Sequence, residues 1–148
     1  MVLTEKPPTS PGAPGARGAA PFDVEGATLF LRAQASWLCR GLEQAADDPI
    51  AVRIVLGAHD ATHGRWLSLI ARVQRSFGPA VAEQLSRVYA FHGRVAGSLE
   101  RGVDPMLEPD LAEQIRRVLA EHLRQVTEAI IDLLEHAASG HADTPPSQ

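Results

Sequence analysis

Apolar residues recur every three or four positions in four separate stretches of the chain, which is the spacing of one face of an α-helix. These stretches are residues 24–46, 49–77, 80–101 and 110–138. The first follows Asp23, a residue type that caps helix N-termini. The second opens with Asp48-Pro49, a cap followed by proline at the first helical position, and ends at Gly78-Pro79. No stretch alternates apolar and polar residues with period two, so the pattern predicts four helices and no strand.

Short connections make neighbouring helices antiparallel. The sequence therefore predicts an all-α protein, an antiparallel up-down-up-down four-helix bundle built from residues 22–138 as one domain. Residues 1–21 and 139–148 are rich in proline, glycine and small polar residues and contain few large apolar side chains. Because such segments bury too little apolar surface to order themselves, we expect disordered N- and C-terminal tails.

Three histidines on successive predicted helices fall near one level of this bundle. His63 lies fifteen residues before Gly78 and His92 fourteen after it, while His122 lies sixteen residues after the next turn, near Met106. At about 1.5 Å of rise per residue, these mismatches are only about 2 to 3 Å along the helix axis. His59 adds an i, i+4 partner for His63. A histidine site for zinc, copper or haem iron is the functional hypothesis for this layer.

Two other interpretations of the same residues stay open. His92 alone occupies a core position, so it is equally explained as a core histidine with a hydrogen-bond partner, while His63 and His122 flank their apolar faces and reach solvent. A pH-responsive packing layer requires the same burial but no metal. Gly64 and Gly93 next to the layer leave room for a small apolar ligand.

Charge is distributed unevenly. Thirteen of the fourteen basic residues are arginines, and the one lysine, Lys6, lies in the predicted tail, which excludes lysine Schiff-base chemistry and a P-loop. No GxGxxG, GxSxG or HExxH motif occurs, so no enzyme class is supported. Residues 49–102 carry a net charge of +4 and residues 104–138 carry −5. We expect the two regions to pair within one copy or between copies. No aromatic residues interleave the arginines, so we do not expect nucleic-acid binding.

A candidate interaction surface combines two patterns. Arg87, Arg94 and Arg101 recur every seven residues, and Phe30 and Trp37 lie on a side of the first helix distinct from its main apolar face. If this second face is exposed, it is a dimer or partner surface. The alternative is that the first helix has one broad apolar face that packs against two neighbouring helices.

Cellular location is indicated by absences in the sequence. The single cysteine, Cys39, excludes an internal disulfide framework and fits a reducing compartment. The chain has no signal-peptide or transmembrane pattern, so we expect a cytoplasmic protein without a membrane partner.

The stretch from Leu99 to Ala112, which contains Gly102, resembles the glycine-containing turn before the dimerising helices of TetR-type transcriptional regulators. Asp48-Pro49-Ile50-Ala51, followed by an apolar helix, is similar to that family as well. The resemblance implies an all-helical body that binds small apolar ligands and dimerises. Residues 1–21 cannot form a helix-turn-helix, so it implies a sensing body without its DNA reader.

The sequence thus leads to one favoured function and two alternatives. We expect a non-enzymatic helical-bundle protein that acts by self-association, as a homodimer, or by partner binding, with room for a small internal ligand. The alternatives are a histidine-based metal- or haem-binding bundle and the ligand-sensing domain of a TetR-like regulator.

Overall fold

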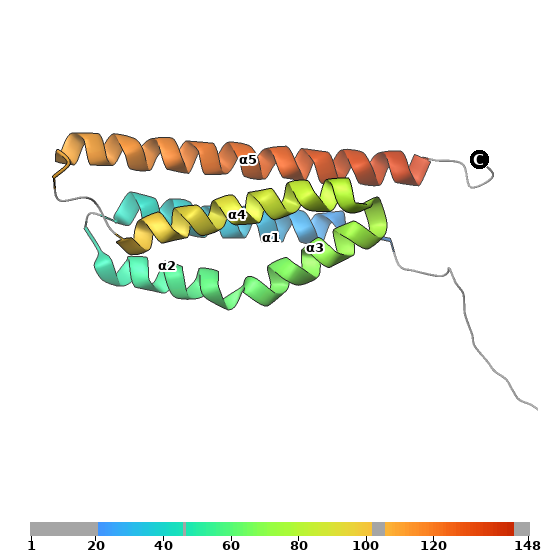
Figure 1. Ribbon diagram of the computed structural model, residues 1–148, viewed down its shortest axis with the longest axis horizontal. Helices are drawn as coiled ribbons and strands as arrows, with labels where there is room; N and C mark the ends of the chain where they lie inside the picture. The colour runs from blue at the N-terminus through green and yellow to red at the C-terminus, as the bar shows by residue number, and fades with distance from the viewer. Residues whose placement is uncertain (1–20, 46, 102–105, 144–148) are drawn as a thin grey trace, which may run out of the picture.

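The computed structural model describes residues 21–45, 47–101 and 106–143, for the last three of these without their side chains (Figure 1). Five helices account for most of these residues: α1 (Val24–Gln44), α2 (Pro49–Ala61), α3 (His63–Phe77), α4 (Pro79–Arg101) and α5 (Pro109–Asp143). No strand occurs in the described ranges, so the predicted all-α class is confirmed. The predicted tails lie outside the described residues, except for Pro21 and for residues 139–143, which continue α5 beyond its predicted end at 138.

Three helix boundaries form as the sequence predicts. Asp23 accepts a hydrogen bond from the Gly26 amide at 2.9 Å and caps α1. Asp48 caps α2 in the same way through the Ala51 amide at 3.0 Å. Gly78 ends α3 at a φ of 94° and a ψ of 174°, an essentially glycine-only conformation that costs other residues about 1 to 3 kcal/mol.

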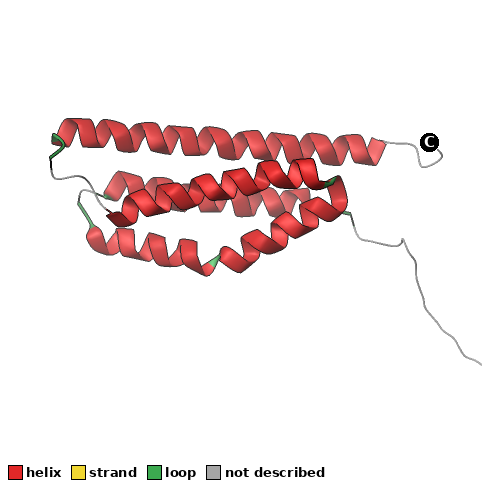
Figure 2. Cartoon of the chain, viewed as in Figure 1, coloured by secondary structure: helices red, strands yellow, loops and turns green. Residues whose placement is uncertain are grey.

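The predicted continuous helix over 49–77 is wrong, because the chain breaks at Thr62 into α2 and α3 (Figure 2). The Thr62 backbone takes a ψ of 4°, and its amide donates to the carbonyl of His59, three residues back, which tightens the last turn of α2. The Thr62 hydroxyl lies 2.8 Å from that carbonyl oxygen and 3.0 Å from Gln34 Oε1 of α1. One hydroxyl has one hydrogen, so it donates to one of these two oxygens at a time.

Successive arms of the fold reverse direction. α1 and α4 run one way along the long axis, and the α2–α3 pair and α5 run the other way (Figure 1). α1 packs against α2 and α5, and α4 packs against α2, α3 and α5. None of the described helices combines the length and hydropathy of a membrane span.

The core consists of two hydrophobic clusters, one toward each end of the molecule. The first cluster joins α1, α3, α4 and the second half of α5, and it contains Trp66, Leu31, Leu85 and Ile131 with almost no exposed surface. The second joins the later half of α1 to α2, the end of α4 and the first half of α5, through residues such as Leu38, Val55 and Leu123. On each arm, at least one polar side chain lies between the residues of the two clusters.

Candidate functional site

A layer of polar side chains separates the two hydrophobic clusters. The polar layer contains one residue from each arm: Gln34 of α1, Thr62 at the α2–α3 break, His92 of α4 and Thr127 of α5. Gln34, His92 and Thr127 are buried. Gln34 contacts Thr62, and His92 Nε2 lies 3.1 Å from Thr127 Oγ1. Since buried polar groups are favourable only when they are paired, these contacts favour one alignment of the four arms along the axis.

Aromatic rings connect this layer to the surface. The Trp66 ring stacks on Tyr89 with centroids 4.6 Å apart and meets His92 edge-on at 5.0 Å. Tyr89 Oη in turn forms a short hydrogen bond with Nδ1 of the exposed His63. Three buried nitrogens, His59 Nδ1, Trp66 Nε1 and His92 Nδ1, have no hydrogen-bond partner among the described residues.

Burial keeps the central histidine neutral. Removal from water, together with the smaller effect of the neighbouring His59, lowers the pKa of His92 to about 3. Burial also lowers the pKa of His59. An imidazolium at His92 therefore forms in the folded protein only in strong acid.

The structure brings three of the four predicted histidines together. His59 and His63 both lie against Tyr89, with ring centroids 6.2 and 5.7 Å away, and His92 contacts Trp66, which stacks on Tyr89. His122 does not join them, because it lies on the exposed side of α5 with its ring edge-on to Phe91 at 4.9 Å. In the described part of the chain no three His, Cys, Asp or Glu side chains are grouped to hold a metal ion. The zinc, copper or haem site stays a prediction.

The five residues predicted to form an interaction surface each have an intramolecular contact. Phe30 is half-buried and meets Trp66 edge-on at 5.3 Å. Trp37 stays 40% exposed beneath the Arg40 guanidinium. The arginines divide among three kinds of contact: Arg87 pairs with Glu83, Arg94 lies over Phe91 and Arg101 donates to Ser98. That surface also stays a prediction.

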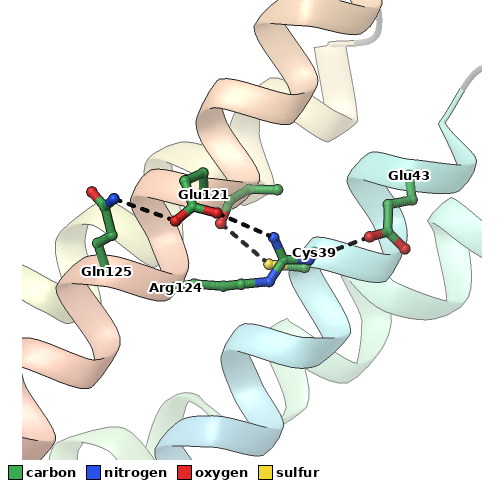
Figure 3. A network of polar contacts seen from close by, with 6 residues as sticks. Cys39, Glu43, Glu121, Arg124 and Gln125 are labelled. Carbon is green, nitrogen blue, oxygen red and sulfur yellow. Dashed lines mark hydrogen bonds and ion pairs between the residues drawn. The ribbon is translucent and has the colours of Figure 1, made fainter.

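Cys39 belongs to a structural network between α1 and α5 (Figure 3). Its thiol donates to the Ala120 carbonyl oxygen at 3.5 Å, and burial raises the pKa of the thiol. Beside it, Arg124 of α5 contacts Glu43 of α1 at 3.3 Å and Glu121 at 3.9 Å. A thiol that is buried and protonated is a packing residue rather than a nucleophile.

The first half of α5 carries a stripe of mostly apolar residues that the other described helices leave partly exposed. This α5 seam consists of Leu111, Ile115, Val118 and His122, spaced by four, three and four residues. Leu111 and Ile115 are nearly half exposed and Val118 is 67% exposed. The spacing is visible in the sequence, but α5 also carries a second and longer apolar stripe, which the sequence predicts as its packing face: Leu119, Leu123, Val126, Ile130, Leu133 and Ala137.

An apolar groove of about 560 Å³ borders the α5 seam. Its walls come from the end of α1, the start of α2, the end of α4 and the start of α5. Leu42, Val52 and Leu99 form its apolar base, and Ile115 is the lining residue that the groove shares with the seam. Three arginines, Arg53, Arg101 and Arg116, line it as well. This groove and the seam adjoin through Ile115 toward one end of the molecule.

Comparison with known proteins gives no family for this chain. No family model, no curated protein and no solved structure matches it.

Proposed function

We propose that this chain is a self-associating helical-bundle protein whose copies pair through the α5 seam. In this proposal α2 and α3 act as one bent arm of an antiparallel four-helix bundle, and α5 presents the face that the bundle leaves uncovered. The observation that carries the proposal is the exposed four-three spacing of Leu111, Ile115 and Val118. Apolar residues at this spacing pack well against a second helix with the same spacing.

Charge favours a second copy as the partner. The later part of α5 carries exposed Asp132 and Glu135, whereas Arg53, Arg101 and Arg116 line the groove next to the seam. If two α5 helices pair antiparallel about a twofold axis near Val118 and His122, the acidic end of each lies beside the basic groove of the other. Such an isologous contact closes at a dimer.

The free energy available from burial of the seam fits a reversible association. Complete burial of a Val, Leu or Ile side chain contributes about 1.5 to 3 kcal/mol, and these three are about half exposed, so each contributes about 1 kcal/mol. A dimer contains six of them, or about 6 kcal/mol, against an association cost of at least about 4 kcal/mol. The net of about 2 kcal/mol alone corresponds to a dissociation constant weaker than about 1 mM, so pairing at micromolar concentration requires the groove contacts as well. We therefore expect a dimer that dissociates on dilution.

The test is the mass of the chain in solution. Sedimentation equilibrium over a series of micromolar concentrations should give wild-type protein a mass that approaches twice 15.9 kDa. Val118→Glu places a charge at the centre of the seam and should give 15.9 kDa throughout. Leu29→Glu is the matched control, since Leu29 of α1 is 66% exposed and lies outside the seam; it should associate like wild type.

Two results would contradict the proposal. One is a wild-type chain that stays at 15.9 kDa at every concentration. The other is equal association of the Val118→Glu and Leu29→Glu chains.

A further inference from the structure

A second and larger groove is lined by the first half of α1 and by α3. The start of α1 and the end of α3 lie at the end of the molecule opposite the start of α5 (Figure 1). The volume of the groove is about 1180 Å³. Ala27, Phe30 and Leu69 form an apolar floor. At one end of this floor, Phe22 and Phe77 meet edge-on with ring centroids 5.2 Å apart.

Three arginines of α3 line the same groove. Arg65, Arg72 and Arg75 lie on one helix face, because they are spaced by seven and three residues. The guanidinium carbon of Arg65 lies 4.7 Å from the centre of the Phe30 ring. Arg72 and Arg75 are exposed and form no ion pair with a carboxylate of the described residues.

The groove has little negative charge of its own. Asp23 is the one carboxylate among its described lining residues, and that carboxylate already accepts the Gly26 amide hydrogen bond. Residues 1–20, which precede the groove in sequence, contain Glu5 against Lys6 and Arg17 and so bring no net negative charge. An anionic ligand would therefore balance the positive charge of the arginines in this groove.

We propose that this groove binds an amphiphile that has an anionic head group and an unbranched alkyl chain. Arg72 and Arg75 are separated by about 4.5 Å along the helix axis, so both guanidinium groups reach one phosphate or carboxylate, a charge-assisted contact. The alkyl chain lies along Leu69, Ala27 and Phe30. Arg65, about 10 Å further along the axis from Arg72, covers the chain from above Phe30. This proposal is independent of the α5 seam.

Binding is measured by isothermal titration calorimetry of the full chain with dodecyl phosphate below its micelle concentration. Butyl phosphate carries the same head group on a short chain, and dodecanol carries the same chain without charge. We expect saturable binding of dodecyl phosphate at one site per chain and at least tenfold weaker binding of both analogues. Phosphatidylcholine vesicles that contain phosphatidylglycerol test the same head-group chemistry on a membrane surface.

The head-group site is tested by the double variant Arg72→Gln/Arg75→Gln, which should weaken dodecyl phosphate binding at least tenfold. Its control is Arg40→Gln/Arg94→Gln, which removes the same charge from two arginines that lie over Trp37 and Phe91 outside the groove. The control should bind like wild type. Thermal melts of both variants establish that they are folded.

The site of the alkyl chain is tested by a substitution on α3 that places a larger side chain in the groove. A Cβ added at Gly64, which lines the groove, meets no atom within 4 Å, and the same is true of Gly57 on α2 outside the groove. Leucine also has a higher helix propensity than glycine, so neither substitution should disrupt its helix. Gly64→Leu should weaken dodecyl phosphate binding, and Gly57→Leu should leave it unchanged.

The proposal is overturned if dodecyl phosphate gives no binding heat, or if Arg72→Gln/Arg75→Gln binds it like the charge control. It is equally overturned if dodecanol binds as tightly as dodecyl phosphate, or if the protein binds anionic vesicles but no monomeric amphiphile. Equal binding by Gly64→Leu and Gly57→Leu would contradict the placement of the alkyl chain.

Discussion

Acid should destabilise this protein through His92, the buried imidazole of the polar layer. The pKa of His92 is about 3 in the folded protein and 6.5 in an unperturbed chain. Between these values the unfolded chain binds a proton that the folded chain does not, so stability rises with pH across this window and is lost as the pH falls. One pKa unit corresponds to about 1.4 kcal/mol. At pH 4.5, two units below the unfolded value, the loss is about 3 kcal/mol.

The variant that isolates this effect is His92→Leu, which replaces the imidazole by an apolar side chain that does not titrate. Thr127 loses its imidazole contact, but a threonine hydroxyl can bond to the carbonyl four residues back in its own helix. The carboxylates and the other histidines titrate in both proteins, so their effects cancel in the difference. Between pH 7 and pH 4.5 the difference in unfolding free energy should move about 3 kcal/mol in favour of the variant.

Urea unfolding followed by far-ultraviolet circular dichroism at pH 7, 5.5 and 4.5 gives this difference. All samples need one fixed protein concentration, since self-association makes apparent stability concentration-dependent. His136→Leu is the control, because it removes an exposed imidazole from α5 and should follow the wild-type curve. A wild-type minus His92→Leu difference that stays constant with pH would refute the reasoning.

Three further outcomes follow from single contacts. Thr62→Val removes the hydroxyl that the buried Gln34 side chain contacts, and it should cost about 1 to 3 kcal/mol of unfolding free energy, whereas Thr62→Ser should recover most of that cost in the same urea titration. Gly78→Ala should cost about 1 to 3 kcal/mol at its φ of 94° and ψ of 174°, and an unchanged melting curve would contradict that geometry. Cys39 is buried and its pKa is raised, so a thiol reagent such as DTNB should react with it in urea and only slowly in native protein; fast native reaction would show that α1 and α5 separate there.

The helix ends were predictable because capping is local chemistry. Asp23, Asp48-Pro49 and Gly78 carry their own donors, acceptors and backbone preferences, and each lies where the sequence places it. The break at Thr62 was not predictable from periodicity, because apolar positions continue in phase on both sides, from Val55 to Trp66. Its stabilising contact comes from Gln34 on another helix, which the pattern of a single segment does not contain.

The histidine layer shows the same limit in another form. Counting residues from a turn gives the height of a side chain along the axis but not its rotation about the axis. His92 follows the spacing of its buried neighbours Val88 and Val95, so both its height along the axis and its rotation about the axis could be predicted from the sequence. His122 directly precedes the fully buried Leu123, and adjacent residues on a helix differ by about 100°, so its ring lies outside. The two grooves were beyond prediction because they depend on how far helices diverge.

The break at Thr62 divides one arm into two segments whose amide protons should exchange with solvent independently. α2 contributes only Val52 and Val55 to the buried core, whereas α3 contributes Trp66, Leu69 and Val73. Segments with little buried apolar contact open more often than the globally stable core. Deuterium should therefore enter α2 before α3, so that α2 unfolds and refolds as a local unit while α1, α4 and α5 stay closed.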